Sequence, residues 1–295
     1  MEYVIETKNL TKRYPNKTAT NNVNMHVKKG DIYGFIGKNG AGKTTTMKMI
    51  LGLANPTTGQ VLINGNSNLV NERKKIGSLI EAPGLFKNKT AYENLKQFSL
   101  ICGGNDKEIK EILEIVGLSN TGSRKAGNFS LGMRQRLGIG IALLGNPEIL
   151  ILDEPINGLD PEGIKDVRDT LIKLNKEKGV TLIISSHLLD ELAKITTRYG
   201  IINEGELVEE ISSEELLKKT SKSLKLKTSD NLKALEILKA SDFDGIIEGE
   251  YISLKNHMDE SNLIAKIIVK SGLELFELSI NNSDFENYFI ERLGK

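Results

Sequence analysis

A glycine-rich segment with two lysines and two threonines has the composition of a phosphate-binding loop. Residues 37–44 fit the pattern G-x-x-x-x-G-K-[ST], in which glycines allow a tight turn whose backbone N–H groups point inward. Lys43 would place a positive charge on the β- and γ-phosphates of a nucleotide, and the Thr44 hydroxyl would reach Mg²⁺. The residues expected at the phosphates are Gly37, Lys38, Asn39, Gly40, Ala41, Gly42, Lys43, Thr44 and Thr45.

An apolar segment that ends in two acids supplies the second chemical group. Residues 149–152 are followed by Asp153 and Glu154. Acids at the end of a buried strand are costly to desolvate unless they face a site. We predict that Asp153 holds Mg²⁺ together with Thr44. Glu154 is predicted to orient the attacking water and to accept its proton.

Strand and helix patterns alternate around these two motifs and would position them. Apolar runs and helical spacing predict strands over 31–36, 149–152 and 180–185, and helices over 43–51 and 164–174. Gly179 would end the second helix, and residues 198–209 are typical of a hairpin. Strands separated by helices imply a parallel sheet covered on both faces, so an α/β domain is predicted.

Four further motifs resemble those of the ATP-binding cassette (ABC) family of P-loop NTPases. Residues 129–136 are similar to the family's signature sequence, usually written LSGGQ, and residues 157–160 resemble its D-loop. His187 ends a strand where the family carries its switch histidine, and Tyr14 stands where the family stacks an aromatic ring on adenine. These ordered motifs over residues 1–215 imply the ATP-binding, ATP-hydrolysing subunit of an ABC transporter. His187 would contact the γ-phosphate.

The signature implies a dimer. Ser130 is predicted to cap a helix whose first turn holds Gly132 and Met133. In the family, the N-terminus of this helix binds the γ-phosphate held by the phosphate loop of the opposite subunit, and Asp160 of the D-loop is counted with the nucleotide-binding residues. Two ATP molecules would be buried head to tail between two chains, which we expect to be identical. Leu131 and Met133 depart from the family pattern, so modified signature contacts are expected.

Glu81 stands where the family usually has a glutamine that touches Mg²⁺ and the attacking water. A carboxylate here would hold Mg²⁺ more firmly, and it would repel the γ-phosphate when the metal is absent. The other interpretation is a surface glutamate in a loop. With a glutamate at this position, the sequence resembles the exporters for lantibiotic self-protection and bacitracin resistance, which also carry an accessory C-terminal domain. The resemblance implies export of an antimicrobial peptide or antibiotic.

A helical arm is expected over about 82–135, with an apolar face formed by Ile109, Ile112, Leu113 and Val116. In exporters this region receives short helices from the membrane subunit. Leu85 and Phe86 are candidates for that socket, and the alternative is that they form the arm's own small core.

Glycine usage marks a domain boundary, with 24 of the 28 glycines in residues 1–215 and 4 in residues 216–295. Apolar spacing in the second part predicts the order strand–helix–strand–strand–helix–strand, with Leu263, Ile264, Ile267 and Ile268 on one helix face. Residues 283–286 form a capping box that would open a last helix through Leu293. This order predicts a small ferredoxin-like α+β accessory domain.

Charge and hydropathy exclude several classes of protein. Forty Lys and Arg against 39 Asp and Glu give a net charge of +1, which disfavours nucleic acid as a partner. No apolar run approaches the length of a membrane span, and the first residues lack the features of a signal peptide. We therefore expect a cytoplasmic protein held at the inner face of the membrane by a separate integral-membrane subunit.

Two other functions were weighed against transport. A soluble ABC ATPase acting on ribosomes or DNA is disfavoured by the single phosphate loop. Only 87 positions separate Lys43 from Ser130, which leaves no room for a long coiled coil. The other is a regulatory ATP-dependent dimer switch with negligible turnover, which phosphate release would test.

A few reactive or charged residues are predicted to be structural. His26, His257 and Cys102 have no partner at metal or triad spacing. The lysines at 218, 219, 222, 225 and 227 are more typical of a solvated face than of a site.

Overall fold

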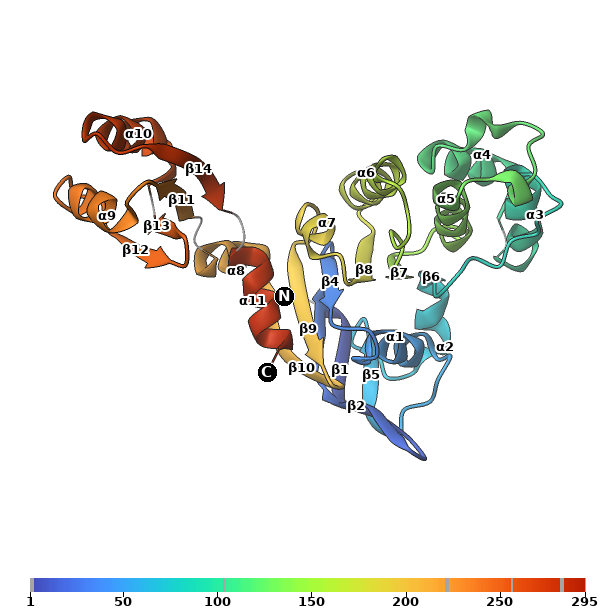
Figure 1. Ribbon diagram of the computed structural model, residues 1–295. Helices are drawn as coiled ribbons and strands as arrows, with labels where there is room; N and C mark the ends of the chain where they lie inside the picture. Colours follow the sequence, from blue (N-terminus) through green and yellow to red (C-terminus); the bar gives the residue numbers. More distant parts are fainter. Residues whose placement is uncertain (1–2, 103, 221–222, 256, 282–283, 295) are drawn as a thin grey trace. The chain divides into compact units, whose positions relative to one another are not determined.

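The computed structural model describes residues 3–102, 104–220, 223–255, 257–281 and 284–294 (Figure 1). The chain splits into two compact units, Met1–Ser213 and Glu214–Lys295. Among the described residues, no helix is long and apolar enough to span a bilayer. Lys222 and Ser283, which belong to the lysine cluster and the capping box, lie outside the described residues.

One sheet of the N-terminal unit is antiparallel. In it, β1 (Tyr3–Tyr14) pairs with three strands, which are β2 (Lys17–Val23), β3 (His26–Lys28) and β5 (Thr58–Ile63). The strands of this sheet are not predicted from the sequence, because polar residues interrupt their apolar alternation. Thr7 and Thr11 are nevertheless buried, and the Thr7 hydroxyl donates to the Val23 carbonyl at 2.8 Å. Register shifts in all three pairings add to the irregularity.

The second sheet has six strands in the order β10-β9-β4-β8-β7-β6. Its neighbours are parallel, except for the β9–β10 hairpin. The strands are β4 (Ile32–Ile36), β6 (Ile76–Leu79), β7 (Ile149–Asp153), β8 (Thr181–Ser186), β9 (Arg198–Asn203) and β10 (Glu206–Ser212). The strands predicted from apolar runs and the predicted hairpin are confirmed, with ends that differ by one to three residues.

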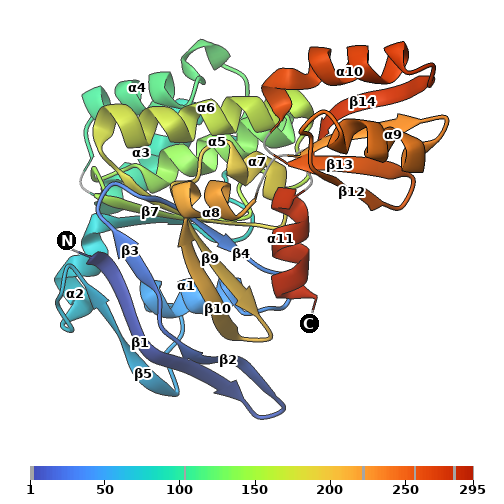
Figure 2. The same cartoon turned by 90° about the vertical axis from the view of Figure 1, so that its left-hand side faces the viewer.

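Helices cover both faces of the parallel sheet (Figures 1 and 2). Helix α1 (Lys43–Leu51) lies between the two sheets, and its Met47, Met49 and Ile50 join a core cluster with residues of both. Over the opposite face lie α5 (Leu131–Ala142) and α6 (Pro161–Lys178), which ends at Gly179 as predicted. The arm adds α3 (Ala91–Cys102) and α4 (Asp106–Ile115), and short helices occur at α2 (Leu69–Glu72) and α7 (Leu189–Ala193).

The predicted apolar face of the arm is confirmed, because Ile109, Ile112, Leu113 and Val116 are all buried. Such a face packs the arm against its neighbours and leaves the polar side of α4 in water. Helix α5, which carries signature residues at its N-terminus, packs against α3, α4 and α6.

The C-terminal unit is a four-stranded antiparallel sheet with strand order β12-β13-β11-β14. Its elements are α8 (Ser213–Lys219), β11 (Ser223–Thr228), α9 (Asn231–Lys239), β12 (Gly245–Glu248), β13 (Tyr251–Lys255), α10 (Ser261–Lys270), β14 (Leu275–Asn281) and α11 (Asp284–Leu293). The prediction for Leu263 was wrong, since this side chain is exposed. Helix α10 turns Ile264 and Ile268, one turn apart, toward the sheet instead.

A carboxylate whose side chain is only 12% exposed joins the two sheets of the N-terminal unit. Glu210 on β10 accepts hydrogen bonds from the Tyr33 hydroxyl on β4 at 2.8 Å and from the His26 backbone N–H on β3 at 2.9 Å. Its other oxygen lies 2.7 Å from His26 Nδ1. Burial, followed by the neighbouring Glu210 charge, raises the pKa of the Tyr33 phenol well above its ordinary value. His26 therefore has the structural role that we predicted.

Replacing Glu210 with alanine is expected to destabilise the N-terminal unit by roughly 2 kcal/mol, because the Tyr33 hydroxyl and the His26 N–H lose their acceptor. Glu210→Gln keeps an acceptor and serves as the control, with a smaller expected loss. The measurement is urea unfolding of each variant and of the parent, followed by a signal that reports on the N-terminal unit alone. Equal stability of Glu210→Ala and the parent would show that the network contributes nothing.

Candidate functional site

Six of the nine residues predicted to bind phosphate line one cleft of about 370 Å³, and Gly37, Lys38 and Ala41 do not. The cleft lies where the loop after β4 meets the carboxyl ends of the strands, the edge at which open parallel sheets bind ligands. It is lined by Tyr14, Lys17, Ala19, Asn39, Gly40, Gly42, Lys43, Thr44, Thr45, Glu154 and Asn157. Most of the lining residues are therefore ones that the sequence motifs predict.

The phosphate loop closes around its lysine. The Lys43 ammonium donates to the Gly37 carbonyl at 2.6 Å and to the Lys38 carbonyl at 3.3 Å, and the side chain is buried. Gly42 adopts a φ of +109°, and a Cβ there would approach the Ala19 carbonyl oxygen to 2.6 Å. Only glycine satisfies both conditions, so the loop shape follows directly from the sequence pattern.

Asp153 is held by hydroxyl groups on both of its oxygens. Thr44 Oγ1 donates to Asp153 Oδ2 at 2.6 Å, and Ser185 Oγ donates to Asp153 Oδ1 at 2.5 Å. These bonds bring the end of β7 to the start of α1 and the end of β8. The hydroxyl and carboxylate oxygens gathered here are the kind of metal ligand that Mg²⁺ prefers.

Glu154 follows Asp153 and lies between two cationic or titratable groups. Its Oε1 is 3.6 Å from Lys43 Nζ, and its Oε2 is 2.7 Å from His187 Nδ1. The backbone has a φ of +51°, and Ser185 Oγ accepts from the Glu154 N–H at 2.9 Å. With a neighbour at each carboxylate oxygen and its backbone held by Ser185, Glu154 is well oriented to act on a group bound at the loop.

Tyr14 lines the mouth of the cleft with its ring about half exposed, and the Lys12 ammonium lies 5.2 Å from the ring centre. An exposed aromatic face beside a phosphate loop can stack on a purine. Lys17 and Asn157 also line the cleft and were missed as site residues. The signal for Asn157 was its place in the D-loop motif, whereas Lys17 is brought in by the β1–β2 hairpin, which the sequence did not predict.

The signature residues lie away from this cleft. Ser130 caps α5, where its Oγ accepts from the Met133 N–H at 3.2 Å, and Gly132 packs against the start of α6. Asp160 caps α6 by accepting from the Gly163 N–H at 3.2 Å. The signature and the D-loop are therefore neighbours, and none of Ser130, Gly132, Met133 or Asp160 lines the phosphate-loop cleft of the same chain.

Glu81 is also absent from the lining of the cleft. Its carboxylate accepts a hydrogen bond from Lys48 Nζ at 2.7 Å, and its backbone φ is +65°. This hydrogen bond is the largest cause of both a lowered pKa of Glu81 and a raised pKa of Lys48. In this conformation the acid predicted to touch Mg²⁺ is paired with a lysine of α1.

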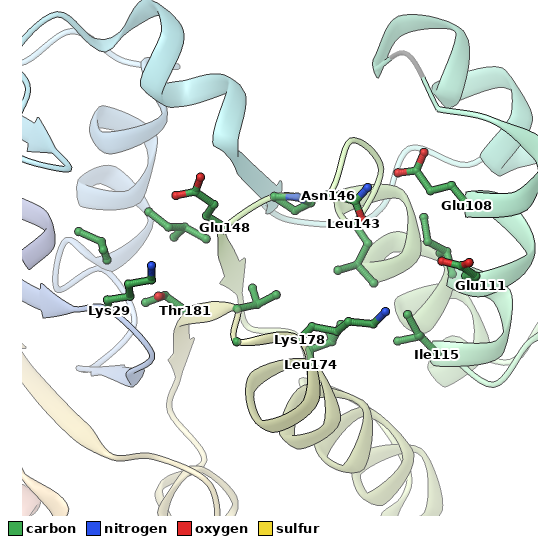
Figure 3. Close-up of a pocket in the computed structure, with 16 residues that line it drawn as sticks. Lys29, Glu108, Glu111, Ile115, Leu143, Asn146, Glu148, Leu174, Lys178 and Thr181 are labelled. Atoms are coloured by element: carbon green, nitrogen blue, oxygen red, sulfur yellow. The ribbon is translucent and has the colours of Figure 1, made fainter.

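A second cavity of about 390 Å³ lies at the amino ends of β7 and β8 (Figure 3). Figure 3 shows Glu108, Glu111 and Ile115 of α4 on one side, with Leu174 and Lys178 of α6 beside them. Its rim carries both signs of charge over an aliphatic floor. None of the predicted site residues lines it, and it lies at the edge of the sheet opposite the phosphate loop.

Comparison with known proteins agrees with this geometry. The family model described as "ABC transporter" matches residues 20–157. The bacitracin transport ATP-binding protein BcrA of Bacillus licheniformis is 43% identical, over 100% of this chain and 98% of the relative. The chain belongs to the ATP-binding proteins of ABC transporters. It is thus an ABC ATPase that binds and hydrolyses ATP as one subunit of a transporter complex.

Two further similarities extend the family assignment. The lantibiotic transport ATP-binding protein SrtF of Streptococcus pyogenes is 44% identical, over 70% of this chain and 89% of the relative. A dimeric ATP-binding cassette in a post-hydrolysis state with ADP and phosphate matches with a TM-score of 0.63 and 28% identity, over 71% of this chain and 98% of that one. The ABC ATPase fold of the N-terminal unit is therefore established, and a dimeric cassette is seen in a relative.

Proposed function

We propose that this ABC ATPase powers export of an antimicrobial peptide or peptide antibiotic, of the bacitracin or lantibiotic class, through a separate integral-membrane subunit. The observation that carries the proposal is likeness over the whole chain, C-terminal unit included, to a protein named for bacitracin transport. The likeness to a lantibiotic transport protein and the glutamate at position 81 support it.

In the proposed mechanism, Glu154 orients the attacking water and accepts its proton. Lys43 and the loop backbone neutralise charge on the phosphates as the β–γ phosphoanhydride bond breaks, and His187 contacts the γ-phosphate. The short distances from Glu154 to Lys43 and His187 support these roles. Tyr14 would stack on adenine. Catalysis would come mostly from positioning and charge stabilisation.

Mg²⁺ is the proposed metal, held by Thr44 and Asp153, with Glu81 as a further candidate ligand. The oxygen donors already in contact at Thr44 and Asp153 suit a hard divalent cation. When bound, the metal would neutralise charge on the β- and γ-phosphates.

The proposed working unit is a homodimer at the inner face of the cell membrane, with no nucleic acid as partner. Ser130, Gly132, Met133 and Asp160 would then complete the nucleotide site of the opposite chain. Their absence from the lining of their own cleft supports this, and the N-terminus of α5 is the kind of position that favours an anionic group. In the proposed homodimer, the opposite chain would supply the signature contacts that the cleft of one chain lacks.

The accessory domain is proposed to be ferredoxin-like and to cover residues 216–295. Its strand order and its antiparallel pairing are those of a βαββαβ unit in which the first and third strands are central. A division of the chain near residue 214 supports the proposed boundary.

The docking site for the membrane subunit is proposed to be a cleft of about 300 Å³ beside Glu81, between the arm and the end of β6. Pro83, Gly84 and Phe98 line it, whereas Leu85 and Phe86 do not. Phe86 instead packs on Phe98 with ring centres 5.8 Å apart, and it remains 44% exposed. Phe86 would thus support one wall of the socket.

Replacing Phe86 with glutamate is expected to reduce recovery of the membrane subunit at least fivefold, because a charge would enter an apolar contact surface. The measurement is affinity purification of the tagged chain from solubilised membranes, followed by mass spectrometry. Leu100→Glu, on an exposed position of α3, is the matched control. Unchanged recovery with Phe86→Glu would contradict the socket.

The same purification tests the proposed function. A stoichiometric polytopic partner, together with raised sensitivity to bacitracin or to a lantibiotic in cells that lack this chain, is the expected result. Ribosomal or DNA-bound partners with no membrane protein would overturn the transport complex. Unchanged sensitivity to every peptide antibiotic tested would overturn the proposed substrate class alone.

A further inference from the structure

Three carboxylates lie at or just beyond the carboxyl ends of two neighbouring strands, at the edge of the sheet where an anionic nucleotide is proposed to bind. Asp153 ends β7 and Glu154 follows it. Glu81 follows β6, which pairs in parallel with β7 so that Leu79 lies opposite Leu152. Three acids around a triphosphate would repel it unless each is compensated. Asp153 is held by two hydroxyls, and Glu154 is held by Lys43 and His187.

The third carboxylate is compensated by Lys48. This lysine follows Thr44 by four residues on α1, so the two side chains project from the same face of the helix. Its ammonium lies 2.7 Å from Glu81 Oε1. Glu81 reaches it from a left-handed backbone conformation, which costs a non-glycine residue free energy, so contacts of the folded chain must hold it there.

We propose that Lys48 is a positioning residue that keeps the Glu81 carboxylate turned away from the phosphate loop until metal and nucleotide are bound. The pair would neutralise the charge that distinguishes Glu81 from an amide and would let nucleotide enter without repulsion. It would also make Lys48 and the metal compete for one carboxylate. The inference rests on the proposed function, because it assumes that the loop binds nucleotide with a metal.

The first test measures binding of a fluorescent ATP analogue to the full chain in EDTA. Lys48→Met is expected to weaken metal-free binding about fivefold, the upper range for loss of one exposed ion pair. Lys48→Met combined with Glu81→Gln is expected to restore affinity to that of Glu81→Gln, because no uncompensated charge remains. Lys48→Arg keeps the cation and should match the parent.

The second test measures binding of Mn²⁺, as a spectroscopic stand-in for Mg²⁺, to the chain with ADP. Lys48→Met is expected to bind Mn²⁺ about fivefold more tightly than the parent, since Glu81 no longer has a competing partner. In the Glu81→Gln background, the same lysine substitution should change nothing.

The matched control is Lys227→Met in the C-terminal unit. Lys227 and Glu250 are also 2.7 Å apart, and their side chains are 37% and 78% exposed, against 36% and 68% for Lys48 and Glu81. A general effect of breaking a surface ion pair would appear in both variants. Nucleotide and Mn²⁺ affinities of Lys48→Met equal to those of Lys227→Met would overturn the proposal. Failure of the parent to bind nucleotide would instead overturn the proposed function.

Discussion

Replacing Glu154 with glutamine is expected to lower ATP turnover at least about a hundredfold while ATP binding is retained, because the amide cannot accept the proton of the attacking water. The substitution keeps the size and one oxygen of the side chain, so the contacts to His187 and Lys43 can be largely preserved. Loss of the negative charge also removes repulsion of the γ-phosphate. A stable ATP-bound dimer should therefore accumulate.

Phosphate release and gel filtration with ATP and Mg²⁺ are the two measurements for this variant. Glu148→Gln is the matched control, because Glu148 precedes the same strand β7 at its opposite end. That variant should hydrolyse ATP at the parental rate and should not be trapped as a dimer. Turnover of Glu154→Gln close to the parental rate would remove Glu154 from the role of base.

The parts of the fold that sequence could predict are those set by local pattern. The strands at 149–153 and 181–186 begin with continuous apolar or β-branched runs, residues 149–152 and 181–184, which are typical of buried parallel strands. The antiparallel sheet was missed because β1 buries threonines and contains Asn9 at a φ of +50°, where its pairing shifts. Side-chain bonds across paired strands, such as that of Thr7 to Val23 sixteen positions away, satisfy those polar groups, and no local pattern records them.

The candidate site likewise contains residues that a local pattern predicts and residues that only long-range contacts bring together. Loop geometry follows from Gly42 and Lys43, whose conformational and charge requirements are local, so those residues were found. The pairing of Glu81 with Lys48 was not predicted, because Lys48 is 33 positions away and the contact depends on how β6 ends beside α1. Lys17 was missed for the related reason that only the unpredicted β1–β2 hairpin brings it to the cleft.

The second large effect concerns the signature residue Ser130, and it tests whether each nucleotide site is built from two chains. Ser130→Asp keeps a side-chain acceptor for the Met133 N–H, so the helix cap is preserved. It places a negative charge where the γ-phosphate of the partner's nucleotide is proposed to bind. ATP turnover is expected to fall at least about a hundredfold, as expected for loss of a main charge-stabilising contact. Ser130→Asn caps the helix without charge and should retain most turnover.

Mixing distinguishes a shared site from a self-contained one. Lys43→Met should also be inactive, because the buried ammonium at the phosphate loop is lost. If Ser130 acts on the opposite chain, a heterodimer of Lys43→Met and Ser130→Asp has one intact site and one site with both defects. An equal mixture then recovers about a quarter of the parental rate, given random pairing and independent sites. If each site is built from a single chain, every site in the mixture carries one defect, and the mixture stays inactive while both variants remain folded.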